Sequence, residues 1–222
     1  MAREKARASR PYRAPLREQA ALRTRLLITK AAKVTFEKQG WSGATMATIA
    51  ERAGVSQSSV EALFKTKSVL LQSAVDYAIR GDIEPVPISD REVTTKIESA
   101  PSAKSMLELH AGHLRAVQGR SAHLALVVEQ AARSDKAVAA LWRRMNANRR
   151  YGVEWAARTL LEKPATKHLQ RVDVERTFWV ALDWSNYRLL TDYVGLTAEQ
   201  YEQWLLDYYL RMFALGRPAT GT

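Results

Sequence analysis

The spacing of apolar residues predicts helices along most of the chain. Between residues 18 and 39 they recur every three or four positions, and Gly40 follows where a left-handed terminating residue is expected. No segment shows sustained strand-like alternation bounded by turn pairs, so the sequence predicts an all-α fold. Further helices are predicted over 67–79, over 102–133 (unbroken or broken near Gly119), and over 135–162, 172–194 and 197–215, with a connector containing a short helix over 81–101.

Residues 45–64, TMATIAERAGVSQSSVEALF, predict two short helices joined by a glycine turn. Thr45 and Ser56 can each cap the start of a helix with a side-chain oxygen, and Gly54 lies in the break between the two. The apolar residues of the second helix point back into a core. Two helices that cross around such a turn form a helix-turn-helix, whose second helix enters the major groove of DNA.

Positive charge is concentrated at the start of the chain. Residues 1–80 hold 15 Lys and Arg against 6 Asp and Glu, whereas residues 81–222 hold 19 against 17. A basic half beside a nearly neutral one is typical of a polyanion-binding module joined to a second unit, although a basic run can also be a solvated surface. Residues 1–17, with five Arg and one Lys, are expected to form a basic flexible arm that either follows DNA or is a solvated tail.

The composition excludes several classes of protein. The sequence has no cysteine, which rules out disulfides, thiolate zinc sites and cysteine nucleophiles. No apolar run approaches the roughly 20 residues that span a bilayer, and no hydrophobic stretch follows the basic N-terminus. We therefore expect no membrane association, no secretory signal and a cytoplasmic location. Because no nucleophile elbow, Walker loop, dinucleotide fingerprint or HExxH motif is present, we expect neither an enzyme nor a cofactor.

Five short segments form a more specific pattern around the helix-turn-helix. They are FEKQGW at 36–41, ATM at 44–46, IA at 49–50, AGVS at 53–56 and LFKTKSVLL at 63–71. With these segments, residues 22–80 resemble the DNA-binding domain of the TetR family of bacterial transcriptional regulators. Nearer the C-terminus, YRLL at 187–190, GLT at 195–197 and YEQWL at 201–205 resemble a pattern that is widespread in the same family.

The resemblance implies an organisation in three parts. These are the basic arm at 1–17, a three-helix helix-turn-helix DNA-binding domain within 18–81, and a helical domain at 82–222 for effector binding and dimerisation. It also implies a homodimeric repressor that binds a near-palindromic double-stranded DNA operator and is released by a small, largely apolar effector. The alternative is an effector-independent DNA-binding or architectural protein.

The resemblance assigns DNA contacts to residues at the starts of three helices. Gln57, Ser58 and Ser59, on the exposed start of the recognition helix, would meet base edges or phosphates. Thr45, through its hydroxyl or amide, and Lys67, at the start of the next helix, would contact phosphates. Gln offers a donor and an acceptor on one edge, small Ser side chains allow close approach, and helix N-termini favour anions.

One position departs from the family pattern. Family members usually carry Tyr, and often His, where this chain has Glu61 and Ala62. A carboxylate is repelled by phosphates, but it can accept a hydrogen bond from the N4 amino group of cytosine. Glu61 therefore either reads a base or turns away and pairs with a neighbouring Lys.

The last predicted helix is apolar on two faces. Both apolar faces of such a helix must be buried. Either its own domain buries one face and a second subunit the other, or a single well-packed monomer buries both. The resemblance implies the first arrangement, with an interface built from the last two helices of each subunit. The candidate interface residues are Tyr201, Trp204, Leu205, Tyr208 and Met212.

The resemblance also implies an effector pocket among the middle helices. Aromatic residues with a few polar groups suit an apolar or amphipathic ligand, although Trp and Met at helical spacing are also typical of a core. Two of the candidates, His110 and His113, lie one turn apart without a carboxylate ligand pattern, so we expect no metal. The full set of candidates is His110, His113, Leu114, Trp142, Met145, Trp155, Trp179, Asp183 and Trp184.

Overall fold

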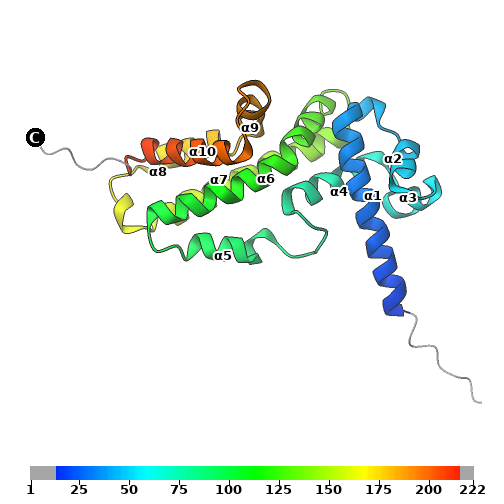
Figure 1. Cartoon of the computed structure of the whole chain (residues 1–222), viewed down its shortest axis with the longest axis horizontal. Coiled ribbons are helices and arrows are strands. Elements are labelled where there is room, and N and C mark those ends of the chain that lie inside the picture. The colour runs from blue at the N-terminus through cyan, green and yellow to red at the C-terminus, as the bar shows by residue number, and fades with distance from the viewer. Residues whose placement is uncertain (1–13, 216–222) are drawn as a thin grey trace, which may run out of the picture.

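The computed structural model describes residues 14–215, and every regular element in that range is a helix, which confirms the predicted all-α fold. Within this range, no helix combines the length and apolar character needed to cross a membrane. At one end of the elongated molecule lie α1 (Ala14–Gly43), α2 (Met46–Ala53), α3 (Gln57–Phe64) and α4 (Lys67–Arg80) (Figure 1). The rest comprises α5 (Glu92–Glu98), α6 (Ala103–Ala131), α7 (Lys136–Leu161), α8 (Arg171–Ala181), α9 (Trp184–Arg188), a π-helical turn (Leu189–Tyr193) and α10 (Ala198–Met212).

The ends of the short N-terminal helices are fixed by the residues that the sequence suggested. The Thr45 hydroxyl accepts a hydrogen bond from Thr48 N at 3.1 Å, and Ser56 Oγ accepts one from Ser59 N at 3.2 Å. Gly54 ends α2 with a φ of 68°, in the left-handed region that glycine adopts without steric cost. The predicted helix, glycine turn and second helix are therefore confirmed.

The first long helix turns a corner at its predicted glycine. α1 loses helical geometry at Gly40, where φ is 67°, and one further turn follows. Phe36 stacks on Trp41 across this corner, with ring centroids 6.0 Å apart. One residue before Phe36, the buried Thr35 hydroxyl accepts a hydrogen bond from Arg52 Nε at 3.0 Å. The corner and this bond hold α2 against α1.

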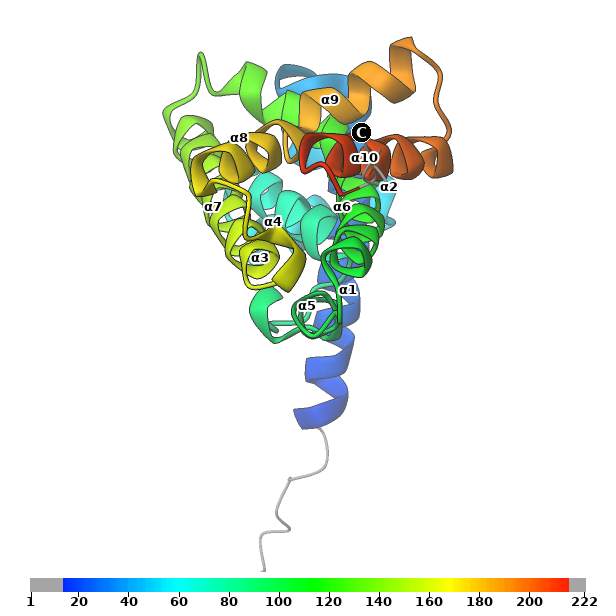
Figure 2. The same ribbon diagram turned by 90° about the vertical axis from the view of Figure 1, so that its left-hand side faces the viewer.

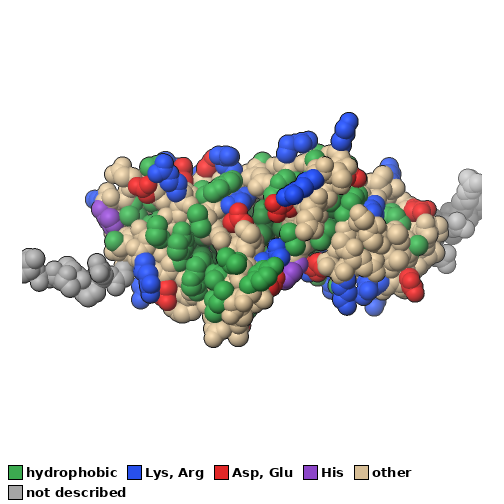
Figure 3. Space-filling view, turned by 90° about the horizontal axis from the view of Figure 1, so that it is seen from above, with side chains coloured by type: hydrophobic (Ala, Val, Ile, Leu, Met, Phe, Trp, Pro, Cys, Tyr) green, Lys and Arg blue, Asp and Glu red, His purple; other side chains and the backbone are tan. Residues whose placement is uncertain are grey.

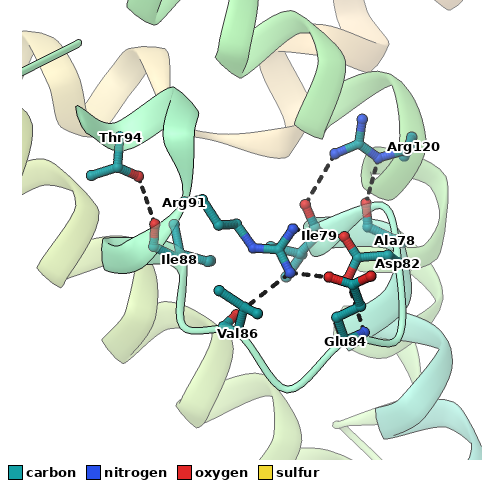
Figure 4. Close-up of polar contacts among 9 residues, drawn as sticks. All are labelled: Ala78, Ile79, Asp82, Glu84, Val86, Ile88, Arg91, Thr94 and Arg120. Atoms are coloured by element: carbon teal, nitrogen blue, oxygen red, sulfur yellow. Dashed lines mark hydrogen bonds and ion pairs between the residues drawn. The ribbon is translucent and has the colours of Figure 1, made fainter. Parts of the chain in front are cut away.

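Two arginines fix the segment where the chain leaves the N-terminal unit (Figure 4). Arg120 of α6 donates to the carbonyl oxygens of Ala78 and Ile79, at 3.0 and 3.1 Å, and so satisfies the open C-terminal end of α4. Arg91 forms a bidentate pair with Asp82, at 2.7 and 2.9 Å, and hydrogen bonding to this guanidinium lowers the pKa of Asp82 to about 2. The end of α4 is thereby tied to α6.

α6 runs unbroken through Gly119, and the predicted short helix in the connector is present as α5. A Cβ atom at residue 119 would lie 3.1 Å from the hydroxyl oxygen of Tyr187. The glycine therefore permits the close approach of α9, and it does not end the helix.

The single helix predicted over 172–194 is wrong, because the chain breaks after Ala181. Asp183 accepts a hydrogen bond from Ser185 N at 2.9 Å and so caps the start of α9. The buried amide of Gln118 donates to the carbonyl oxygens of Ala181 and Asp183, at 3.1 and 3.2 Å. The backbone groups that the break exposes are thus satisfied from α6, a partner that leaves no periodicity in the sequence.

Two clusters of buried apolar side chains form the core, and α6 contributes to both. The first cluster joins α1–α4 to residues 124–131 of α6 and 138–145 of α7. The second joins the first half of α6 to α5, the rest of α7, α8 and α10. Viewed along the long axis of the molecule, α8 and α10 lie on one side of α6 and α7, and α5 lies on the other side (Figure 2). Packing therefore continues across residue 81, where the expected domain boundary falls.

Gln118 is expected to be a strong determinant of stability, because it also accepts a hydrogen bond from the buried Tyr201 hydroxyl, at 2.6 Å. Gln118→Ala should lower the free energy of unfolding by about 3 kcal/mol, since it leaves buried polar groups unpaired beside a cavity. Gln130→Ala, at an exposed position of the same helix, should change it by less than about 0.5 kcal/mol. Urea unfolding followed by circular dichroism checks both values. Equal effects of the two substitutions would contradict the role of Gln118.

Candidate nucleic-acid interface and cavity

α3 turns one face into the first core cluster and the other to solvent, at the end of the molecule opposite α8 and α10 (Figure 1). Its fully buried residues are Val60 and Phe64, and Ser59 is half-buried. Its exposed residues are Gln57, Ser58, Glu61 and Ala62. Three of the six residues predicted to contact DNA, Gln57, Ser58 and Glu61, therefore lie together on one accessible face.

Glu61 is paired within α3, and its partner is Gln57 rather than the neighbouring Lys of the second alternative. Gln57 Nε2 donates to Glu61 Oε1 at 2.7 Å, between side chains one helical turn apart. A carboxylate can only accept, so the amide nitrogen of Gln57 must face it. The Oε1 of Gln57 and the second oxygen of Glu61 remain as acceptors on an exposed surface.

The start of α3 carries a small network of hydroxyl groups. Ser56 Oγ lies 3.0 Å from Ser58 Oγ and 2.7 Å from Ser59 Oγ. At the start of α2, the exposed Thr45 hydroxyl lies 3.2 Å from that of Thr48. These hydroxyls sit beside backbone N–H groups at helix N-termini, where anions are favoured, but their present partners are other protein groups.

Lys67 has a structural role in place of the phosphate contact that the resemblance implied. Its ammonium donates to the carbonyl oxygens of Trp41 and Ala44, at 2.7 and 3.0 Å. It also lies 4.2 Å from the centre of the Trp41 ring, and burial lowers its pKa. Lys67 therefore joins the start of α4 to the corner after α1 and has little freedom to reach DNA.

Residues 28–74 match the model for bacterial regulatory proteins of the tetR family. The chain carries a TetR-family domain. The match runs from α1 into α4 and includes the whole helix-turn-helix, so the protein is a DNA-binding transcriptional regulator. A comparison with curated proteins finds no significant match.

Solved structures with the same fold extend the likeness beyond the TetR domain. One is a protein from Mesorhizobium loti assigned to the TetR family, with 20% identity, a TM-score of 0.61, and coverage of 88% of this chain and 97% of that one. Another, assigned to the same family, comes from a Rhodococcus species, with 18% identity, a TM-score of 0.60, and coverage of 86% and 98%. A protein from Pseudomonas aeruginosa assigned as a transcriptional regulator has 17% identity, a TM-score of 0.60, and coverage of 90% and 92%. At these identities the likeness concerns the fold.

The candidate dimer residues outside the TetR domain divide into buried and accessible ones. Tyr201 and Leu205 have no exposed surface, because they pack into the second core cluster of their own chain, so they cannot form part of a subunit interface. Trp204 and Tyr208 are half-buried, and Met212 is 55% exposed. Exposed apolar residues that the sequence analysis did not select are Val172, Val180, Leu189, Tyr193 and Val194.

Three of the candidate effector residues, Trp142, Asp183 and Trp184, line a cavity of about 160 Å³ between α6, α7 and α9. Its wall also includes Arg149 and Arg188, which the sequence analysis did not select. Arg188 could not be found from the sequence, because the break before α9 is what brings it to the cavity.

The other candidate effector residues lie away from this cavity, mostly in the core. Leu114 and Met145 are buried, and Trp179 lies beneath Arg149, whose guanidinium is 4.1 Å from the ring centre. His113 is partly buried on α6, and Trp155 donates from its indole to Glu98 Oε1 at 2.7 Å.

His110 is a core residue as well. It lies 3.1 Å from the Tyr209 hydroxyl through Nδ1 and packs edge-on against Phe178, with centroids 5.2 Å apart. Burial, and to a lesser extent the charge of His113, lowers the pKa of His110 from 6.5 to about 3.

This histidine should make the protein less stable in acid. Between its unfolded and folded pKa values, the unfolded chain binds a proton that the folded protein excludes, so falling pH favours unfolding. Between pH 7.5 and 5, His110 should lower the free energy of unfolding by about 2 kcal/mol. Urea unfolding at several pH values measures this loss. His110→Gln should remove it, and the same slope in the variant would show that the loss arises elsewhere.

Proposed function

We propose that this protein is a homodimeric transcriptional repressor that binds a near-palindromic operator and leaves it when a small molecule occupies the C-terminal part. The exposed acceptor face of α3, within a TetR-family domain, carries the proposal. Two-fold related recognition helices read half-sites about one helical turn of DNA apart. We assign DNA binding to residues 18–81, effector binding and dimerisation to 82–222, and the role of a basic arm to 1–17. Of this arm, residues 14–17 belong to the first turn of α1, and residues 1–13 lie outside the described residues.

Dimerisation is supported by apolar surface on the C-terminal helices. Val172 and Val180 of α8 are 50% and 48% exposed, and Met212 of α10 is 55% exposed. Seen from above, hydrophobic side chains gather over the half of the molecule that α8 and α10 occupy (Figure 3). A contiguous apolar surface of this kind costs free energy in water unless a partner covers it. An isologous contact between two copies would cover it on both.

Release by an effector is supported by the way the two parts share a core. The cavity residues Trp142 and Trp184 pack against the cluster that also contains the apolar side chains of α1–α4. Arg144 of α7 lies 3.7 Å from Asp76 of α4, as an ion pair across the same contact. A ligand that prefers one arrangement of α6, α7 and α9 would thereby bias the positions of the recognition helices.

The protein should bind a fragment of its own upstream region in preference to unrelated DNA at about 150 mM salt, as measured by fluorescence anisotropy. Gln57→Ala should weaken binding to that fragment by about tenfold and leave binding to unrelated DNA nearly unchanged, since it removes a base contact. Gln130→Ala, an exposed substitution on α6, is the matched control and should have no effect. Equal binding to all DNA, with Gln57→Ala weakening it uniformly, would favour the alternative of an architectural protein.

The subunit contact has its own test. The wild-type protein should sediment as a dimer, at twice the chain mass of 25.0 kDa, in analytical ultracentrifugation. The double substitution Val180→Asp and Met212→Asp should shift it to monomers at micromolar concentration, because it buries charge in an apolar contact. Leu22→Asp, at an exposed residue of α1, is the control and should leave the dimer intact. A dimer that survives the double substitution would place the interface elsewhere.

A further inference from the structure

The cavity between α6, α7 and α9 has two aromatic walls. Trp142 of α7 and Trp184 of α9 both line it, with ring centroids 6.0 Å apart and planes inclined by 45°. The volume of about 160 Å³ is close to the roughly 150 Å³ of a protein cavity that holds benzene. The cavity is therefore of the right size and surface for a single six-membered ring.

The guanidinium of Arg188, on the wall of the cavity, has a buried nitrogen without a hydrogen bond in the described part of the chain. Arg188, at the end of α9, has a side chain that is only 18% exposed, and its buried Nε has no hydrogen-bond partner within the described residues. The nearest carboxylate oxygen, Asp192 Oδ2, lies 3.6 Å from Nε, which is beyond a good hydrogen bond, and it also contacts His123 at 3.0 Å. A buried guanidinium nitrogen without an acceptor is costly, and an incoming anion would relieve that cost.

The other charged side chains that line the cavity are paired with protein groups or exposed to water. The Nε of Arg149 also has no hydrogen-bond partner within the described residues, but its terminal nitrogens are occupied: they pair with Asp183 at 2.8 Å and donate to the Trp179 carbonyl oxygen. Asp183 also accepts from the backbone and hydroxyl of Ser185 as the cap of α9. Glu129 is exposed to water. Arg188 is thus the group best placed to bind a new anionic partner.

We propose that the cavity binds a monocyclic carboxylic acid, with the ring against the side chains of Trp142 and Trp184 that line it and the carboxylate on the guanidinium of Arg188. A planar guanidinium matches a carboxylate with two parallel hydrogen bonds, and the ring contacts supply the apolar part of the binding. The inference rests on the proposed function, because it names the chemical class of the effector. It replaces the largely apolar ligand expected from the sequence with an amphipathic anion.

Through the residues that line the cavity, a bound ligand would act directly on the packing of the DNA-binding unit. Both tryptophans contact the first core cluster, which is the core of α1–α4. A ring held against both tryptophans acts on the contact of α7 and α9 with that cluster. A ligand further along the second cluster would not touch it.

The test uses three probes that separate ring from charge. Isothermal titration calorimetry with the full chain should show saturable binding of benzoate, at one molecule per subunit. Benzyl alcohol, which has the ring without the charge, and acetate, which has the charge without the ring, should each bind at least about tenfold more weakly. No saturable benzoate binding, or equal affinities for benzoate and benzyl alcohol, would overturn the proposal.

Substitutions at Arg188 locate the site. Arg188→Gln should weaken benzoate binding by at least about tenfold, and Arg188→Lys, which keeps the charge but loses the planar fork, by less. Arg158→Gln, at an exposed arginine of α7 outside the cavity, is the matched control and should bind benzoate like the wild type. Thermal melts of each variant confirm folding. If Arg188→Gln and Arg188→Lys both bind benzoate normally, the carboxylate is held elsewhere and the assignment is wrong.

Anisotropy with the upstream DNA fragment separates this proposal from the repressor function. Benzoate should lower the affinity of the wild type for that fragment and leave the affinity of Arg188→Gln unaffected. If the unliganded protein binds no such fragment, the repressor function fails whether or not benzoate binds. If it binds the fragment but the calorimetry shows no benzoate binding, only the assignment of the ligand fails.

Discussion

The structure depends on α6 being one continuous helix that contributes buried side chains along its whole length. Residues 103–122 pack into the core of the C-terminal helices, and residues 124–131 pack into the core of α1–α4. An unbroken helix transmits displacement along its axis, because its backbone hydrogen bonds resist bending within a packed core. The side chains of Gln118 and Arg120 lie near the change from one core to the other, and each satisfies backbone carbonyl groups of a neighbouring segment. The end of α4 and the break before α9 are therefore both held in place by the same helix, α6.

This arrangement makes the DNA-binding unit an extension of the C-terminal core. The helix-turn-helix is held by buried apolar contacts, by the hydrogen bonds from Lys67 to two carbonyl oxygens, and by the hydrogen bond from Arg52 to Thr35. None of these interactions uses the exposed face of α3, which stays free to meet a partner. Stability and recognition are thus assigned to opposite faces of a helix only eight residues long.

The chemistry of the recognition face follows from one pair of side chains. Because Glu61 accepts from Gln57, the pair presents acceptor atoms outward. In the major groove, acceptors are matched by the exocyclic amino groups of cytosine and adenine, whereas guanine offers acceptors of its own. Under the proposed function, an acidic residue at this position would favour contacts with these amino groups over contacts with guanine.

The sequence alone determined the helical class, the caps at Thr45 and Ser56, the turn at Gly54 and the position of the recognition helix, because these features depend on residues within a few positions of each other. Only the tertiary structure decided which apolar faces are covered and which remain open. It buried Tyr201 and Leu205, turned Lys67 inward, and broke the helix after Ala181. It also brought Arg188 and Trp142, 46 residues apart, to one cavity. Contacts between distant segments depend on how whole helices pack. Helical periodicity shows which side of a helix is apolar, but it does not show which other helix packs against that side.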